Sequence, residues 1–277
     1  MSGMAAPTDK NVHKSLREVW LFLALTFAIS WGLGAAYLLF PGTAALFGPM
    51  NATSAGFYIV GYAPTISAVT LSLAFGGFAG LKSLLARLVQ PFRLAWLFVA
   101  ALTFPLIALL LAAAMPLLDL HWPVRFHSIL VTLPLVLFTT GQIVVNTGPL
   151  GEELGWRGYA LPRLLERWNV VVCGLILGFF WTVWHIPAFF VPGAMAMSFA
   201  NFGWWALDTF ALSVFMAWLF VRAGGNIVIA GMIPHFVING MGRVGAWVSR
   251  PEEAMSIALL MLVVFLVTGT GRRKREV

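Results

Sequence analysis

The feature that most limits how this chain can fold is a series of long apolar runs separated by short polar segments. A helix that crosses a bilayer needs about 20 mainly apolar residues. Runs of about that length occupy residues 19–40, 56–79, 94–117, 128–145, 170–190, 202–221, 227–242 and 254–270. The seventh run is short for a full span. We therefore predict an all-α, polytopic membrane helical bundle of about eight transmembrane helices.

Composition supports a membrane protein over a soluble one. Hydrophobic residues make up 60% of the 277 residues and charged residues 10%, against about 45–50% and about 25% in soluble domains. The net charge of +7 could indicate nucleic-acid binding. The basic residues instead lie between the apolar runs, as orientation signals do in membrane proteins. We expect residues 1–277 to form a single integral membrane domain that contacts the lipid bilayer and no nucleic acid.

The distribution of Lys and Arg predicts the orientation. If the N-terminus is cytoplasmic, fourteen of the 17 Lys and Arg residues fall in cytoplasmic segments and three in outer segments. The cytoplasmic set includes Arg157, Arg163 and Arg167, which follow the fourth run. Cytoplasmic loops carry an excess of Lys and Arg. We predict an even number of spans, with both termini cytoplasmic, in the plasma membrane of a prokaryote.

A few ionisable and polar residues interrupt the runs. Placing a charged side chain in hydrocarbon costs about 2.5–3.5 kcal/mol on insertion scales, so such residues need a functional or structural reason. They form three groups within a core of about residues 148–242: Glu152-Glu153-x-x-x-Arg157, Trp181-x-x-x-His185 and His235-x-x-x-Asn239. The fifth run also holds Gly174 and Gly178, a Gly-x-x-x-Gly pair that would let another helix approach closely.

The first group predicts a division of roles between two acids. On a helix, Glu153 and Arg157 are four residues apart with the acid first, the favoured order for an ion pair. Glu152 is rotated by about 100° from Glu153. It therefore remains available to face a cavity as a base or ligand. The alternative is a charged helix start at the cytoplasmic surface, where the helix dipole favours acids.

The other two groups supply imidazoles and an amide. Trp181 lies one turn before His185 and could stack on its ring or wall a site, although a lone buried histidine is often a packing residue. His235 and Asn239 share one helical face, and the alternative for them is an interhelical hydrogen-bonding pair. From separate helices, the three groups can converge.

Their combination predicts hydrolysis at an acyl carbon. Glu152, His185 and His235 match a catalytic zinc site whose fourth position holds water. Alternatively, without metal, Glu152 and His185 could activate water by general-base catalysis. His235 and Asn239 would then donate hydrogen bonds to the oxyanion of the tetrahedral intermediate. Both alternatives remain open at this point.

The three groups, in this order, resemble the motifs of the CPBP family, which contains CAAX prenyl endopeptidases and bacteriocin-processing or immunity relatives. The resemblance covers about residues 150–242. It implies that Glu152 activates the water and that Glu153, supported by Arg157, completes the acidic part of the catalytic site. It also implies that His185 is the second-motif histidine and that His235 and Asn239 act as metal ligands or oxyanion stabilisers. The second motif usually opens with Phe, and here that position is Trp181.

The resemblance implies an intramembrane endopeptidase, of metalloprotease or glutamate type, that cleaves a membrane-anchored peptide or protein substrate. One alternative is a non-catalytic immunity or scaffold protein of the same fold, and a second is a transporter. The shared site requires one geometric condition. His185 lies about 22 Å along its helix from residue 170. The Glu152 helix must therefore dip into the membrane, or the fifth helix must start on the cytoplasmic side of the hydrocarbon.

Overall fold

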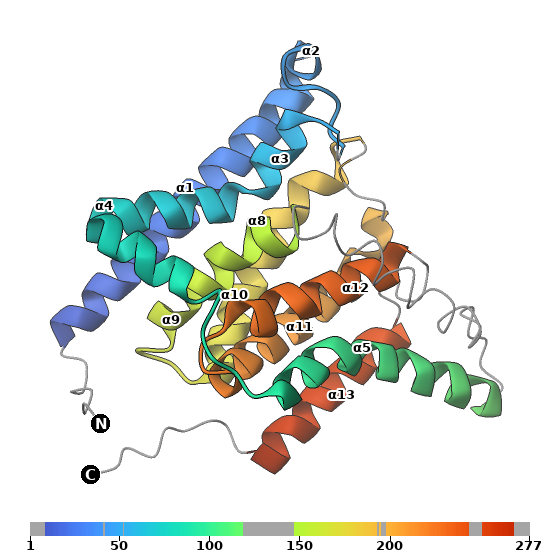
Figure 1. Ribbon diagram of the computed structural model, residues 1–277. Coiled ribbons are helices and arrows are strands. Elements are labelled where there is room, and N and C mark those ends of the chain that lie inside the picture. Colours follow the sequence, from blue (N-terminus) through green and yellow to red (C-terminus); the bar gives the residue numbers. More distant parts are fainter. Residues whose placement is uncertain are drawn as a thin grey trace.

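The computed structural model describes residues 9–118, 147–243 and 251–268, apart from positions 41, 52, 193 and 195–197 (Figure 1). Within these residues the regular structure is entirely helical, which confirms the predicted all-α fold. The fourth predicted span, residues 128–145, lies outside the described residues.

Five of the described helices are long and apolar enough to cross a membrane. They contain α1 (Asp9–Leu39), α4 (Ala63–Ala86), α5 (Leu94–Ala114) with η1 (Met115–Leu118), α10 (Val170–His185) with η3 (Ile186–Phe189), and α11 (Phe202–Arg222) with η4 (Phe199–Asn201). The seventh predicted span corresponds to η5 (Val228–Met232) and α12 (Ile233–Arg243), and the eighth to α13 (Pro251–Thr268). A short helix, α2 (Thr43–Phe47), follows α1. The chain is an integral membrane protein.

The second predicted span is built from two helical segments. Helix α3 (Ala55–Gly61) leads into α4, and the hydrogen bonds from Tyr62 N to Tyr58 O and from Ile66 N to Tyr62 O carry the helical pattern across the junction. The chain then reverses at Gly77, whose φ is 57° and ψ is −153°. A Cβ at Gly80 would lie 2.4 Å from the carbonyl oxygen of Ser72. In a straight helix these two residues, eight positions apart, would be separated by about 12 Å along the axis. Helix α4 is therefore bent back on itself, as Figure 1 shows.

Helices α10 and α11 pack against each other along a glycine face. A Cβ on Gly174 would lie 2.6 Å from Val214 Cα, and one on Gly178 would lie 3.1 Å from Phe210 Cα. Small residues let helix backbones approach this closely in membranes. The predicted close approach at this Gly-x-x-x-Gly pair is confirmed, with α11 as the partner helix.

The motif with the two acids lies on a helical stretch at the centre of the bundle. It consists of α8 (Pro149–Glu153), the π-helical η2 (Leu154–Ala160) and α9 (Leu161–Leu164). It contacts α1, α4, α10, α11 and α12. Arg157, expected in a cytoplasmic segment, is completely buried here. Its charge is balanced inside the protein by Glu153, 3.0 Å away, and its position relative to the membrane stays a prediction.

Candidate active site

A helical hairpin brings the first two motifs together. The central stretch ends at Leu164, and α10 begins at Val170, so the two helices run antiparallel from a short turn. At about 1.5 Å per residue, Glu152 lies about 18 Å before Leu164, and Trp181 lies about 17 Å beyond Val170. The two side chains therefore stand at the same depth. The geometric condition is met because the Glu152 helix runs into the bundle beside α10.

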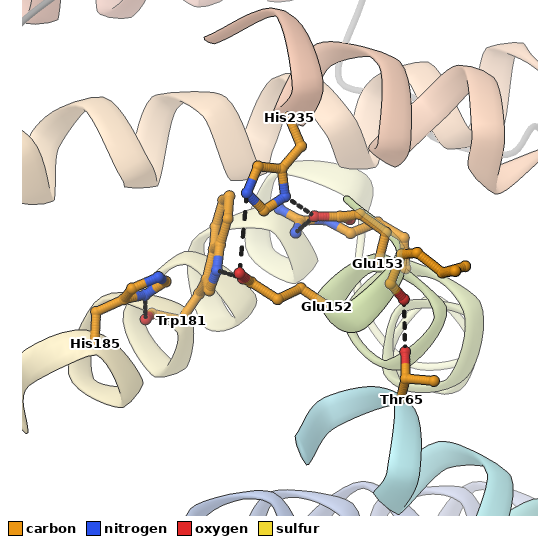
Figure 2. A network of polar contacts seen from close by, with 8 residues as sticks. Thr65, Glu152, Glu153, Trp181, His185 and His235 are labelled. Atoms are coloured by element: carbon orange, nitrogen blue, oxygen red, sulfur yellow. Dashed lines mark hydrogen bonds and ion pairs between the residues drawn. The ribbon is translucent and has the colours of Figure 1, made fainter. Parts of the chain in front are cut away.

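Glu153 is the centre of a buried ionic network (Figure 2). Its Oε1 accepts hydrogen bonds from Arg157 Nη1 at 3.0 Å and from His235 Nδ1 at 2.7 Å. The predicted ion pair with Arg157 is present. Because a carboxylate can only accept, the Nδ1 of His235 carries a proton, and in the neutral form of the ring Nε2 would then have the lone pair. A carboxylate behind an imidazole fixes its tautomer and orientation in this way.

Glu152 faces the other nitrogen of the same imidazole. Its Oε1 lies 4.0 Å from His235 Nε2, and its Oε2 accepts a hydrogen bond of 2.5 Å from Trp181 Nε1. The side chain is buried. Loss of hydration on burial raises the pKa of Glu152 to about 7, and the charge of Glu153 acts in the same direction. A carboxylate with this pKa exchanges protons readily at neutral pH.

The indole of Trp181 lies at the middle of the site. The Arg157 guanidinium stands 4.4 Å from its ring centroid. The ring of His235 meets it edge-on, with 5.2 Å between centroids. Trp181 therefore connects all three motifs through contacts that a sequence pattern does not display.

His185 lies on the far side of Trp181 from Glu152 (Figure 2). Its Nδ1 donates to the carbonyl oxygen of Trp181 at 2.8 Å, and its ring packs edge-on against Trp184 and Trp205. Because a carbonyl oxygen can only accept, Nε2 of the neutral ring carries the lone pair. Within the described part of the chain, His185 makes no hydrogen bond to Glu152 or His235.

Asn239 follows His235 by one turn of α12 and is exposed. Both residues border Gly148, the residue before α8. A Cβ on Gly148 would lie 2.8 Å from Asn239 Nδ2 and 3.0 Å from His235 Nε2. The third motif is therefore brought beside the first where Gly148 leaves room for both polar groups.

Two further positions support the site although no motif pointed to them. A Cβ on Gly231, in η5, would lie 2.6 Å from Glu153 Oε2, so only glycine lets this turn pass the carboxylate. Thr65 Oγ1 donates to the carbonyl oxygen of Leu150 at 2.8 Å and ties α8 to α4. In the sequence, the only sign of this role is that Gly231 lies four residues before His235. That spacing could not be interpreted without the positions of the helices, because the carboxylate that Gly231 passes belongs to another helix.

The predicted zinc site remains a prediction. Among the residues that the structure describes, no three His, Cys, Asp or Glu side chains are gathered so that they could hold a metal ion. In particular, the indole of Trp181 separates Glu152 from His185. The arrangement of these described side chains therefore does not fit a three-ligand metal site.

Comparison with known proteins identifies the part of the chain that carries these groups. Residues 132–241 match a family model described as type II CAAX prenyl endopeptidase Rce1-like. A curated relative, CAAX prenyl protease 2 of Methanococcus maripaludis, is 33% identical over 93 residues. The match covers 32% of this chain and 34% of the relative, so it spans about a third of the length of each. The resemblance to the CPBP family is thus confirmed over residues 132–241, where the chain matches the Rce1-like family model and where every candidate site residue lies.

Proposed function

We propose that this protein is an intramembrane endopeptidase in which Glu152 activates a water molecule to hydrolyse a peptide bond of a membrane-anchored substrate. One observation carries the proposal. Buried Glu152 faces, at 4.0 Å, Nε2 of a histidine whose Nδ1 donates to a second carboxylate, and burial raises the pKa of Glu152 to about 7. The match to the Rce1-like family and to a relative named a prenyl protease supports the same reaction.

The spacing between Glu152 and His235 suits a bridging water. Their facing atoms, Oε1 and Nε2, are 4.0 Å apart, too far for a direct hydrogen bond. With Glu152 ionised and His235 neutral, both atoms are acceptors, so a water between them would donate one hydrogen to each and keep its oxygen lone pairs for attack. We assign this position to the nucleophilic water.

The reaction then proceeds by proton transfer through Glu152. The water oxygen bonds to the carbonyl carbon of the substrate while one water proton passes to Glu152 Oε1, and the carbonyl oxygen becomes an oxyanion. The exposed amide of Asn239 donates a hydrogen bond to that oxyanion. When the intermediate collapses, the C–N bond breaks and Glu152 returns its proton to the leaving nitrogen. The products are a carboxylic acid and an amine, and Glu152 is ionised again.

The remaining polar groups hold this geometry. Glu153 orients the imidazole of His235, and Arg157 balances the charge of Glu153 so that two carboxylates can lie close together. We assign His185 to the substrate side of the site, because it lies beyond Trp181 from Glu152 among the rings of Trp184 and Trp205.

A substrate for such a site would be anchored in the bilayer and reach the protein laterally. The relative's name supports a prenylated peptide as the first substrate to test. A plain transmembrane peptide is the second, because nothing in the described contacts requires a lipid group.

Cleavage by detergent-purified protein tests the proposal. We suggest two fluorogenic reporters: a farnesylated peptide with a CAAX terminus and an unprenylated transmembrane peptide. The wild type should cleave at least one of them, and Glu152→Gln should lose about a thousandfold or more in activity, because the amide cannot serve as the base. Glu166→Gln, at an exposed glutamate, is the matched control and should retain activity.

Two further observations separate the alternatives. Each protein is also assayed with a chelator: cleavage that persists favours the metal-free mechanism, and cleavage that is lost and restored by Zn²⁺ would assign a metal. If the wild type cleaves neither reporter while Glu152→Gln supports the cellular function at an unchanged protein level, the scaffold role replaces the peptidase. Solute flux in proteoliposomes that is unaffected by His235→Ala would instead point to a transporter.

A further inference from the structure

We propose that Trp181 is a positioning residue whose indole N–H holds one oxygen of Glu152, so that the other oxygen, Oε1, alone serves as the base. This inference rests on the proposed function and deepens it. It concerns the one motif position where the chain carries Trp instead of the Phe that usually opens the second motif. Phenylalanine has no hydrogen-bond donor, so this interaction is a property of the tryptophan.

The first observation is the hydrogen bond itself. Trp181 Nε1 lies 2.5 Å from Glu152 Oε2, and both side chains are buried. The indole nitrogen is a donor only, so the carboxylate must be the acceptor. Hydrogen bonds from an N–H to an ionised carboxylate are shorter and stronger than those between neutral groups. Oε2 is therefore engaged, while Oε1 points toward His235 Nε2 at 4.0 Å.

The second observation is that the indole cannot easily turn away. The guanidinium of Arg157 lies 4.4 Å from its ring centroid, and the ring of His235 meets it at 5.2 Å. Arg157 is in turn paired with Glu153, which also orients His235. The same network that fixes His235 thus fixes Trp181, and through Trp181 it fixes the rotation of the Glu152 carboxylate.

The consequence is kinetic. Without the N–H, the carboxylate can rotate, and Oε1 is held less often in line with the water and His235. This affects the proton-transfer step more than substrate binding, because Trp181 is only 4% exposed. Loss of such a charge-assisted hydrogen bond should lower kcat about tenfold or more, with KM changed less than about twofold.

The test compares two replacements that differ in shape. Trp181→Phe removes the N–H and part of the ring. Replacement of Trp181 by 3-benzothienylalanine, in which sulfur takes the place of the N–H, removes the donor and keeps the bicyclic shape. Trp31→Phe is the control, because it removes an indole N–H that donates to the carbonyl oxygen of Trp184 at 3.2 Å, away from Glu152. kcat and KM are measured with whichever fluorogenic reporter the wild type cleaves, along with thermal unfolding of each variant.

Both replacements of Trp181 should lower kcat about tenfold with little change in KM, and Trp31→Phe should match the wild type. A wild-type kcat for the benzothienyl variant would refute the positioning role, since the donor would then be unnecessary. The role is also refuted if Trp181→Phe loses activity and unfolds at a lower temperature while the benzothienyl variant keeps its activity. In that case the bicyclic ring would act by packing alone. If the wild type shows no Glu152-dependent cleavage, the proposed function itself has failed, and this role falls with it.

Discussion

Replacing Gly231 by alanine should lower the activity without substituting any motif residue, because the new side chain would press on Glu153. The added Cβ would lie 2.6 Å from Glu153 Oε2 and 3.1 Å from its Cδ and Cγ. Ordinary contacts begin at 3.4 Å, so the carboxylate would have to retreat by about 0.8 Å. It is not a loose side-chain end, because Arg157 and His235 both hold its other oxygen.

The magnitude follows from the bond that this retreat weakens. The hydrogen bond from His235 Nδ1 to Glu153 Oε1 is 2.7 Å long, and a shift of that size takes it to the limit of hydrogen bonding. Hydrogen bonds to charged groups are worth about 1.5–3 kcal/mol. At about 1.36 kcal/mol for each tenfold change in rate, kcat/KM should fall roughly 10- to 160-fold. Overpacking should also lower the free energy of unfolding by about 1–3 kcal/mol.

The assay measures kcat/KM with the reporter peptide and thermal unfolding in detergent, for Gly231→Ala beside Gly203→Ala. A Cβ on Gly203, in the first turn of α11, meets nothing within 4 Å. Both changes are helical Gly-to-Ala substitutions and share the same propensity gain of about 1 kcal/mol. Their difference therefore isolates the clash with Glu153. Wild-type kcat/KM in a folded Gly231→Ala protein would refute the proposal that Glu153 orients His235 for the reaction.

Two further predictions concern proton transfer and the space around the oxyanion. Burial, together with the charge of Glu153, raises the pKa of Glu152 to about 7. Because only the ionised form is a base, kcat/KM should rise with pH and reach half its maximum near pH 7. A flat profile from about pH 5.5 to about 8.5 would contradict the assignment of Glu152 as the base. Gly148→Ala should lower kcat/KM about tenfold or more, because the added Cβ would lie 2.8 Å from Asn239 Nδ2 and displace it. Circular dichroism should show that the variant keeps normal helicity. Full activity would mean that the amide of Asn239 does not take part in the reaction.

The comparison of sequence and structure is clearest at the acidic motif. The ion pair between Glu153 and Arg157 could be predicted because residues four apart on a helix are neighbours whatever surrounds the helix. The position of that helix could not be predicted in the same way. Its charges predicted a cytoplasmic segment, but they gave no indication that Arg157 would be completely buried, with its charge balanced within the protein by Glu153.

The amino-acid sequence by itself determined the membrane class, most of the span positions, the glycine face of α10 and which polar residues share a helical face. These properties depend on run length and helical periodicity, which are local. Only the tertiary structure decided that Glu153 holds His235, that Trp181 holds Glu152, and that Gly231 and Gly148 leave room for them. Those contacts join residues 82 and 29 positions apart along the chain. They depend on how closely helices approach and how they are rotated, which is set by packing over many side chains at once.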